Sequence, residues 1–180
     1  SLTRVDAVLT PRHSLLVSGG YAPSTTRDAT LGTFVPPAAT VDITDAGAHA
    51  SVSERALVGA TASLESTVQF VHYLTAVDGQ GAAPMMLLPE TTLGNFFNTQ
   101  HRSTQTVQWV ESLTHSYKGL GGVHLLKAGL DVLHASYDGT SDSTSLQIDR
   151  SDGTLARRLD FAGHGVQSVR STDAALFLQD

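Results

Sequence analysis

The sequence predicts an all-β fold, an antiparallel meander of about seven long strands. Apolar and polar residues alternate over one run after another, and a period of two places successive side chains on opposite faces of a strand. Ser and Thr are abundant, at 18 and 21 of 180 residues, whereas only 16% of the residues are charged. This composition favours sheets with one apolar face and one polar, largely uncharged face.

The runs follow one another along the whole chain. Pro11 and Arg12 separate the first two runs, and proline favours a tight turn there because it sets φ and lacks an N–H donor. The clearest alternation lies in 60–73, where the apolar set includes Leu64, Val68 and Phe70. The expected strands span 2–10, 13–21, 46–53, 60–73, 104–115, 123–138 and 172–178.

The stretch 123–138 fits two patterns. As a strand, it places Leu126, Ala128, Leu130 and Val132 on one face and Lys127 and Asp131 on the other. As a helix, it would pair Lys127 with Asp131 four residues later. Gly129 in the interior disfavours a helix by roughly 1 kcal/mol, and the neighbouring runs are rich in Thr and Val. We therefore expect a strand.

A short hairpin is expected between 138 and 171. The segment Ser151-Asp152-Gly153-Thr154 joins the β-type runs 145–150 and 155–161, and Asp-Gly between two such runs is a strong hairpin signal. These arms are too short and polar to cross a lipid core. We therefore place the hairpin in an extracellular connection.

The lengths of the connections indicate a transmembrane β-barrel. Short turns follow the first, third and fifth runs, whereas the long loops 22–45, 74–103 and 138–171 follow the others, an asymmetry typical of outer-membrane barrels. We expect residues 1–180 to form one partial barrel domain. Tyr21, Tyr73 and Tyr137 lie near the loop ends, where an aromatic girdle would lie. Only Tyr21 shares the apolar parity, so the other two need a bulge or face inward.

Four short motifs carry a family resemblance. They are Thr10-Pro11-Arg12-His13-Ser14-Leu15, His124-Leu125-Leu126-Lys127-Ala128-Gly129, Ser151-Asp152-Gly153-Thr154 and Leu176-Phe177-Leu178-Gln179-Asp180. In this order the chain resembles the barrel portion of TonB-dependent outer-membrane receptors, especially the type with a carboxypeptidase-regulatory-like domain. The resemblance implies a barrel of about 22 strands, plugged by an N-terminal domain, that binds and imports a scarce ligand with energy passed through TonB. This chain would supply about seven strands, without the plug.

The resemblance also implies partners and a location. The partners would be outer-membrane lipid, an unknown small ligand, and the TonB complex through the missing plug. The location would be the bacterial outer membrane. Both ends of the chain fall at strand-like runs, so we expect a piece of a longer protein. Two alternatives stay open: a soluble all-β binding module of a secreted or surface protein, and a structural or adhesive surface protein.

The sequence argues against several other functions. The net charge of −6 and the absence of basic runs argue against nucleic-acid binding. There is no cysteine, and the histidines do not occur at zinc-site spacings. No G-x-S-x-G marks a nucleophile, and Glu65 and Glu111 lie in different runs. We expect no enzyme activity, no cofactor and no metal. The histidines are His13, His49, His72, His101, His115, His124, His134 and His164.

The long loops hold candidate ligand contacts. Exposed apolar residues in loops often mark contact sites, and two paired arginines lie in the hairpin. Our hypothesis is an extracellular ligand-binding lip formed by Met85, Met86, Phe96, Phe97, Arg157 and Arg158. Alternatively, the loop buries its apolar residues against the barrel mouth and the arginines form a solvated face.

Overall fold

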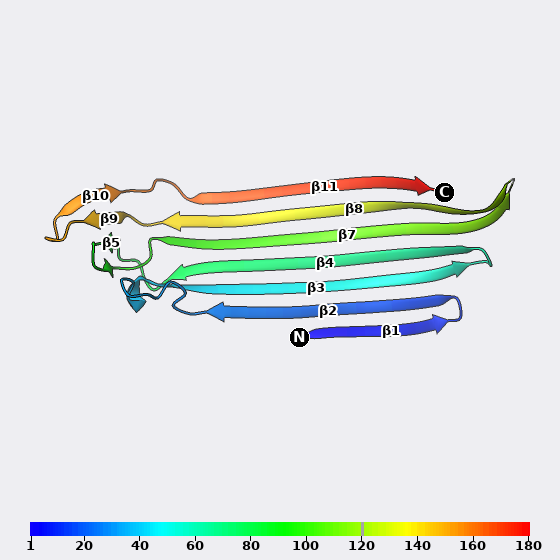
Figure 1. Cartoon of the computed structure of the whole chain (residues 1–180), viewed down its shortest axis with the longest axis horizontal. Helices are drawn as coiled ribbons and strands as arrows, with labels where there is room; N and C mark the ends of the chain where they lie inside the picture. The colour runs from blue at the N-terminus through cyan, green and yellow to red at the C-terminus, as the bar shows by residue number, and fades with distance from the viewer. Residues whose placement is uncertain (120) are drawn as a thin grey trace.

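Seven long strands form one antiparallel sheet in the order β1-β2-β3-β4-β7-β8-β11 (Figure 1). The computed structural model describes residues 1–119 and 121–180. The long strands are β1 (Leu2–Thr10), β2 (His13–Thr26), β3 (Val41–Val58), β4 (Ala62–Gly79), β7 (Asn98–Gly119), β8 (Gly122–Ser143) and β11 (Gly165–Gln179). The connections hold η1 (Pro37–Ala39), β5 (Met85–Leu87), β6 (Thr92–Leu93), β9 (Leu146–Asp149) and β10 (Leu155–Leu159). The expected all-β meander is confirmed, and 123–138 is part of strand β8.

The short turns lie together at one end of the sheet and the long connections at the other (Figure 1). Residues 11–12 join β1 to β2, and 59–61 join β3 to β4, where Gly59 has φ +70°. A left-handed φ favours glycine because it has no Cβ. The third turn includes Leu120, which lies outside the described residues. Gly121, with φ +99°, follows it.

The strands are longer at the loop end than the sequence pattern predicts. The expected loops 22–45, 74–103 and 138–171 begin and end inside strands, so the connections shorten to 27–40, 80–97 and 144–164. Backbone pairing continues there although the apolar alternation stops. Even Pro23 does not end strand β2. It pairs with Ala46 of β3 on one side, and on its other side there is no strand, because β1 reaches only to the level of Gly20. Its missing N–H therefore lies at an unpaired edge, where proline is tolerated.

The register builds continuous rows of side chains across the sheet, because paired residues share a face. Pairing from β2 to β11 runs without a register shift in the described residues, and β1 has one shift near Val8. One row consists of Val5, Val17, Val52, Val68, Trp109, Val132 and Ala174. The face that carries this row is called the apolar face below. The row beside it on the opposite, polar face consists of Arg4, Ser18, Ser51, Gln69, Gln108, Leu133 and Asp173.

The long connections fold together into a cap at the loop end. A second sheet has the order β10-β9-β5-β6, in which β5 and β9 pair in parallel. The expected hairpin is confirmed as β9–β10, but its pairing with β5 was not predicted. The first connection joins the cap, since Phe34 O accepts the N–H of Thr92 at 2.7 Å. Ala39 and Thr40, at the end of this connection, are fully buried.

Within the described residues, no helix has the length and apolarity needed to span a membrane.

Candidate functional site

The apolar face is exposed across the width of the sheet. Trp109 and Leu113 are each 42% exposed, whereas Ser112, between them on the polar face, is only 9% exposed. Along β7, side chains on the apolar face are generally more exposed than their neighbours on the polar face. Side chains on a concave face crowd together, so this alternation indicates that the sheet curves toward its polar face. Large apolar side chains on the convex face have no covering layer in the described chain. An exposed apolar surface of this extent marks a face that meets another apolar medium or partner.

Two glutamates interrupt the apolar face, and each has a hydrogen-bonding partner. Glu54 Oε1 lies 3.0 Å from His13 Nδ1. Glu111 Oε2 accepts the indole N–H of Trp109 at 3.1 Å. The same N–H lies 3.2 Å from Ser66 Oγ. Glu111, which breaks the apolar pattern in the sequence, is therefore held by its neighbour in the same strand.

The polar face is joined by hydrogen bonds between side chains of adjacent strands. Gln108 Nε2 donates to both carboxylate oxygens of Asp131 at 2.9 Å. Ser18 and Ser51 hydroxyls lie 2.7 Å apart. Toward the turns, Arg55 and Glu65 form an ion pair at 3.4 Å beside a hollow of about 490 Å³. This face is suited to water and polar solutes rather than to hydrocarbon.

The tyrosines divide between the two faces. Tyr21 shares the apolar face, as its parity predicts, whereas Tyr73 and Tyr137 lie on one row of the polar face, with Thr104 between them. The unbroken register excludes a bulge that would turn them outward. Gly47 leaves room for the first ring, since a Cβ added there would lie 3.0 Å from Tyr73 Cε1. Tyr73 is 61% exposed.

Three stacked rings lie on the apolar face near the turn end, and the sequence pattern did not single them out. Tyr117 stacks on His115 with ring centroids 6.2 Å apart and on His124 at 5.1 Å. Their register places them on the face of Leu113. Amphipathic rings in this position are typical of the interface between a membrane and water.

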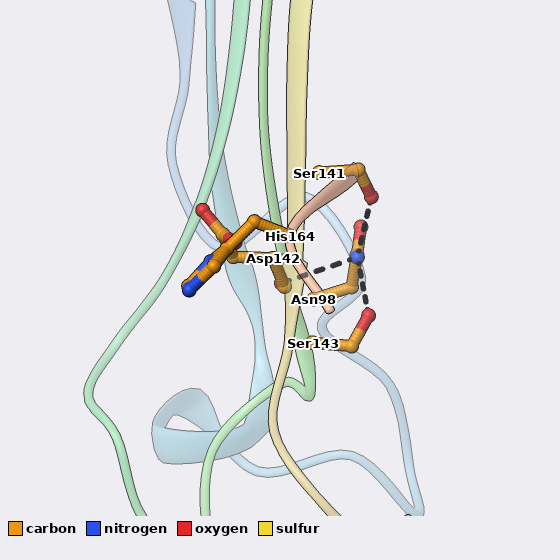
Figure 2. Close-up of polar contacts among 5 residues, drawn as sticks. All are labelled: Asn98, Ser141, Asp142, Ser143 and His164. Carbon is orange, nitrogen blue, oxygen red and sulfur yellow. Dashed lines mark hydrogen bonds and ion pairs between the residues drawn. The ribbon is translucent and has the colours of Figure 1, made fainter. Parts of the chain in front are cut away.

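A cavity of about 370 Å³ lies at the loop end among residues from four segments, 81–82, 96–99, 142–144 and 161–164. Phe96 and Phe97 line it from the approach to β7, with ring centroids 5.1 Å apart. Phe161, from the connection before β11, stacks on Phe97 at 5.5 Å. The polar side includes Thr99, Ser143 and Thr144, together with Asp142 and His164, which are joined by a 2.5 Å contact between carboxylate and imidazole (Figure 2).

The cavity unites only two of the proposed lip residues. Phe96 and Phe97 line it, but Met85 and Met86 lie in β5 of the small sheet. Arg157 and Arg158 lie in β10, where Arg158 pairs with Asp160 at 2.7 Å. The lip hypothesis named Phe96 and Phe97 for their apolar character. It missed Phe161, Asp142 and His164, because only the tertiary fold brings them to the same place.

Beside the cavity, on the other side of β8 from Asp142, Asn98 anchors a polar cluster (Figure 2). Its amide nitrogen lies 3.0 Å from Ser141 Oγ and 2.8 Å from Ser143 Oγ, and its Oδ1 accepts a hydrogen bond from Gln100. Asn98 is 6% exposed. The cluster joins the loop ends of β7 and β8. No sequence signal distinguishes this asparagine from Asn95, the other asparagine of the chain.

Among residues 1–119 and 121–180, no three metal-ligating side chains gather closely enough to hold a metal ion. Four histidines each pair with a single acid, in the pairs His13–Glu54, His101–Asp78, His124–Asp180 and His164–Asp142. His72 and His134 instead lie within hydrogen-bonding distance of the hydroxyls of Ser103 and Thr172.

The fold of this chain can now be compared with known structures. Its main features are the rows of side chains across the sheet, the short turns at one end and the capped long loops at the other. The chain is similar in fold to part of an outer-membrane transporter. The match is to the crystal structure of the outer membrane transporter YddB from Escherichia coli, with a TM-score of 0.62 and 12% sequence identity. It covers 98% of this chain and 24% of that transporter chain. No protein-family model matches the chain, and no curated protein matches its sequence.

The similarity concerns the fold. It confirms the antiparallel sheet as resembling a segment of an outer-membrane transporter barrel, over nearly the whole chain. Because this chain spans about a quarter of that transporter's length, the activity of a complete barrel does not follow from it.

Proposed function

We propose that this chain forms part of the wall of a bacterial outer-membrane barrel that binds and imports a scarce ligand in a TonB-dependent way. One observation carries the proposal: an uninterrupted apolar row crosses all seven strands, backed by a polar row one residue away. Alternation of this kind, continued from strand to strand, is what a wall between lipid and a wet lumen requires. The fold similarity to an outer-membrane transporter supports it.

The orientation follows from the two ends of the sheet. Outer-membrane barrels have short turns on the periplasmic side and long loops outside, so the cap would be extracellular. A tilted strand crosses the hydrocarbon core with about 9–11 residues, but β4 has 18 and β8 has 22. On the apolar face, the row of Val107 and His134 is followed toward the loops by the row of Gln105, Ser136 and Arg170. The loop half of the wall would therefore project beyond the membrane.

The polar face would line the lumen. Its hydrogen-bonded Ser, Thr, Gln and Asp side chains tolerate water, and Tyr73 and Tyr137 project into the same space. The receptor's TonB contact and the plug would belong to other parts of the complete protein.

The sole tryptophan provides the test, because Trp109 lies on the face proposed to meet lipid. In vesicles of brominated phospholipid, Trp109 fluorescence should be quenched strongly, whereas aqueous iodide should have little effect. The matched control is the double variant Gln108→Trp/Trp109→Phe, which moves the indole to the polar face one residue away. That variant should be resistant to lipid bromine. Quenching of the parent protein only by iodide, together with solubility without detergent, would instead identify a soluble binding module.

The TonB-dependent step has a separate measurement. The complete membrane-inserted protein should bind the purified periplasmic domain of TonB in calorimetry. If Trp109 is quenched by lipid bromine but the protein does not bind TonB, the result supports the barrel wall and contradicts the TonB-dependent step.

A further inference from the structure

The cavity lined by Phe96, Phe97 and Phe161 lies outside the proposed lumen. Asp142 pairs with Thr99 in the β7–β8 register, and the unbroken alternation along β8 places Asp142 on the same face as Val132. Figure 2 shows Asp142 and His164 on one side of β8, with Ser141 and Ser143 directed to the other. A solute bound here would sit on the convex side of the wall, at the loop end. The cavity therefore needs a function other than the transport path.

Its apolar part consists of aromatic rings held against one another. The ring planes of Phe96 and Phe97 are tilted by 44°, and those of Phe97 and Phe161 are nearly parallel, at 21°. The faces of aromatic rings carry partial negative charge, so rings around a cavity attract a cation that lacks a tight hydration shell. Phe96 and Phe97 are half-buried, which limits competition from water.

Its polar part adds a carboxylate. Asp142 Oδ1 contacts His164 Nδ1, whereas Asp142 Oδ2 has no hydrogen-bond partner among the described residues. The described residues that line the cavity include no lysine or arginine. An anion would therefore be repelled by Asp142 with only the His164 imidazole to offset that charge, and a neutral apolar solute would leave this oxygen to water. A compact organic cation satisfies both the rings and the carboxylate.

We propose that this cavity binds an alkylammonium group, with the methyl or methylene shell against the three phenylalanines and the charge beside Asp142. The volume of about 370 Å³ accommodates a small ligand rather than a polymer. The same chemistry occurs in free quaternary amines and in the choline headgroup of phospholipids. The proposal does not depend on TonB or on import.

Choline and its uncharged isostere 3,3-dimethylbutan-1-ol separate charge from shape. In calorimetry on the membrane-inserted protein, choline should bind about tenfold more tightly than the isostere. Phe97→Leu and Asp142→Asn should each reduce choline binding by about the same factor. Equal binding of the two compounds, or unchanged choline binding in Asp142→Asn, would overturn the proposal.

The chain offers a matched control for each variant. Asp78 pairs with His101 at 2.9 Å near the loop end of the same face but does not line the cavity, so Asp78→Asn should leave choline binding unchanged. Phe34 is an exposed loop phenylalanine away from the lining, and Phe34→Leu should also be neutral. Loss of binding in either control would likewise contradict the assignment. Strand content by circular dichroism shows that each variant is folded.

Nanodiscs distinguish the two sources of the cation. If the headgroup is the natural occupant, phosphatidylcholine discs should weaken choline binding relative to phosphatidylglycerol discs, because the lipid competes. Equal choline binding in the two discs would assign the site to a free amine.

Discussion

Gln108 Nε2 lies 2.9 Å from both carboxylate oxygens of Asp131, while Trp109 and Val132, the next residues along the two strands, are paired on the opposite face. A step of one residue thus changes the surroundings from a hydrogen-bonded polar surface to an exposed apolar one. This relationship is the basis of the proposed wall.

A charge should be costly on one face and tolerated on the other. Val132→Lys places an ammonium on the apolar face and should lower the free energy of unfolding by about 2–4 kcal/mol in a bilayer. Leu133→Lys, one residue away, places it on the polar face opposite Asp173, where the change should stay below about 1 kcal/mol. Urea unfolding in lipid vesicles measures both. Equal losses would contradict the assignment of the faces.

Gly129 should resist replacement more than Gly139. A Cβ at Gly129 would collide with the backbone oxygen of Glu111 and with the ring of Phe177. Because a backbone atom in a paired strand cannot move freely, Gly129→Ala should cost about 1–3 kcal/mol of unfolding free energy. At Gly139, the collision is with the mobile end of the Tyr137 side chain, so Gly139→Ala should cost less. Chemical denaturation of the two variants under the same conditions checks the order.

Asn98 should stabilise the loop end locally. Its side chain is buried and donates toward Ser141, Ser143 and the backbone oxygen of Asp142. Asn98→Ala leaves these acceptors without their donor and should cost about 1–3 kcal/mol. Asn98→Asp keeps the oxygen that accepts from Gln100 but loses the donors, so it should behave similarly. Hydrogen exchange should quicken at 141–143 and remain slow in the middle of β8. A uniform increase along β8 would argue against a local effect.

The β9–β10 turn should weaken only in strong acid. Thr154 donates its hydroxyl at 2.7 Å and its backbone N–H at 2.9 Å to Asp152 Oδ1, which lowers the pKa of this carboxyl below its usual range. A lowered folded-state pKa means that the contribution is complete above the ordinary carboxyl pKa of about 3.9 and is lost as the pH falls through the lower folded value. NMR titration of the Thr154 amide should follow this loss. In Asp152→Asn the turn should show no such acid transition.

Strand existence could be predicted from local pattern, but strand length could not. The run 60–73 was recognised because Leu64, Val68 and Phe70 alternate with polar residues, yet β4 continues to Gly79. Beyond Tyr73, pairing with β3 and β7 holds the backbone although the pattern has faded. The alternation of apolar and polar residues shows which face of a strand is apolar. The length of a strand depends instead on backbone hydrogen bonds, which need only a neighbouring strand.

Some residues of the candidate cavity could likewise be predicted from the sequence, and others could not. Phe96 and Phe97 were identifiable because they are adjacent apolar residues in a loop, and the β9–β10 hairpin because Asp-Gly specifies its turn. Phe161, Asp142 and His164 were not, since none belongs to a motif. Their meeting depends on how β8 and β11 pair and on where the connection between them returns.

Local sequence patterns were enough to predict the all-β class, the two faces and the alternation of short and long connections, because these follow from a side-chain period of two and from local turn chemistry. The fold was needed to show that Tyr73 and Tyr137 lie on the polar face without a bulge, that β5 pairs with β9, and that the aromatic cavity lies on the face opposite to these tyrosines. Those outcomes depend on register and on contacts between distant segments. The register across the sheet is set by the pairing of every strand with its neighbour, so the sequence of a single strand cannot predict it.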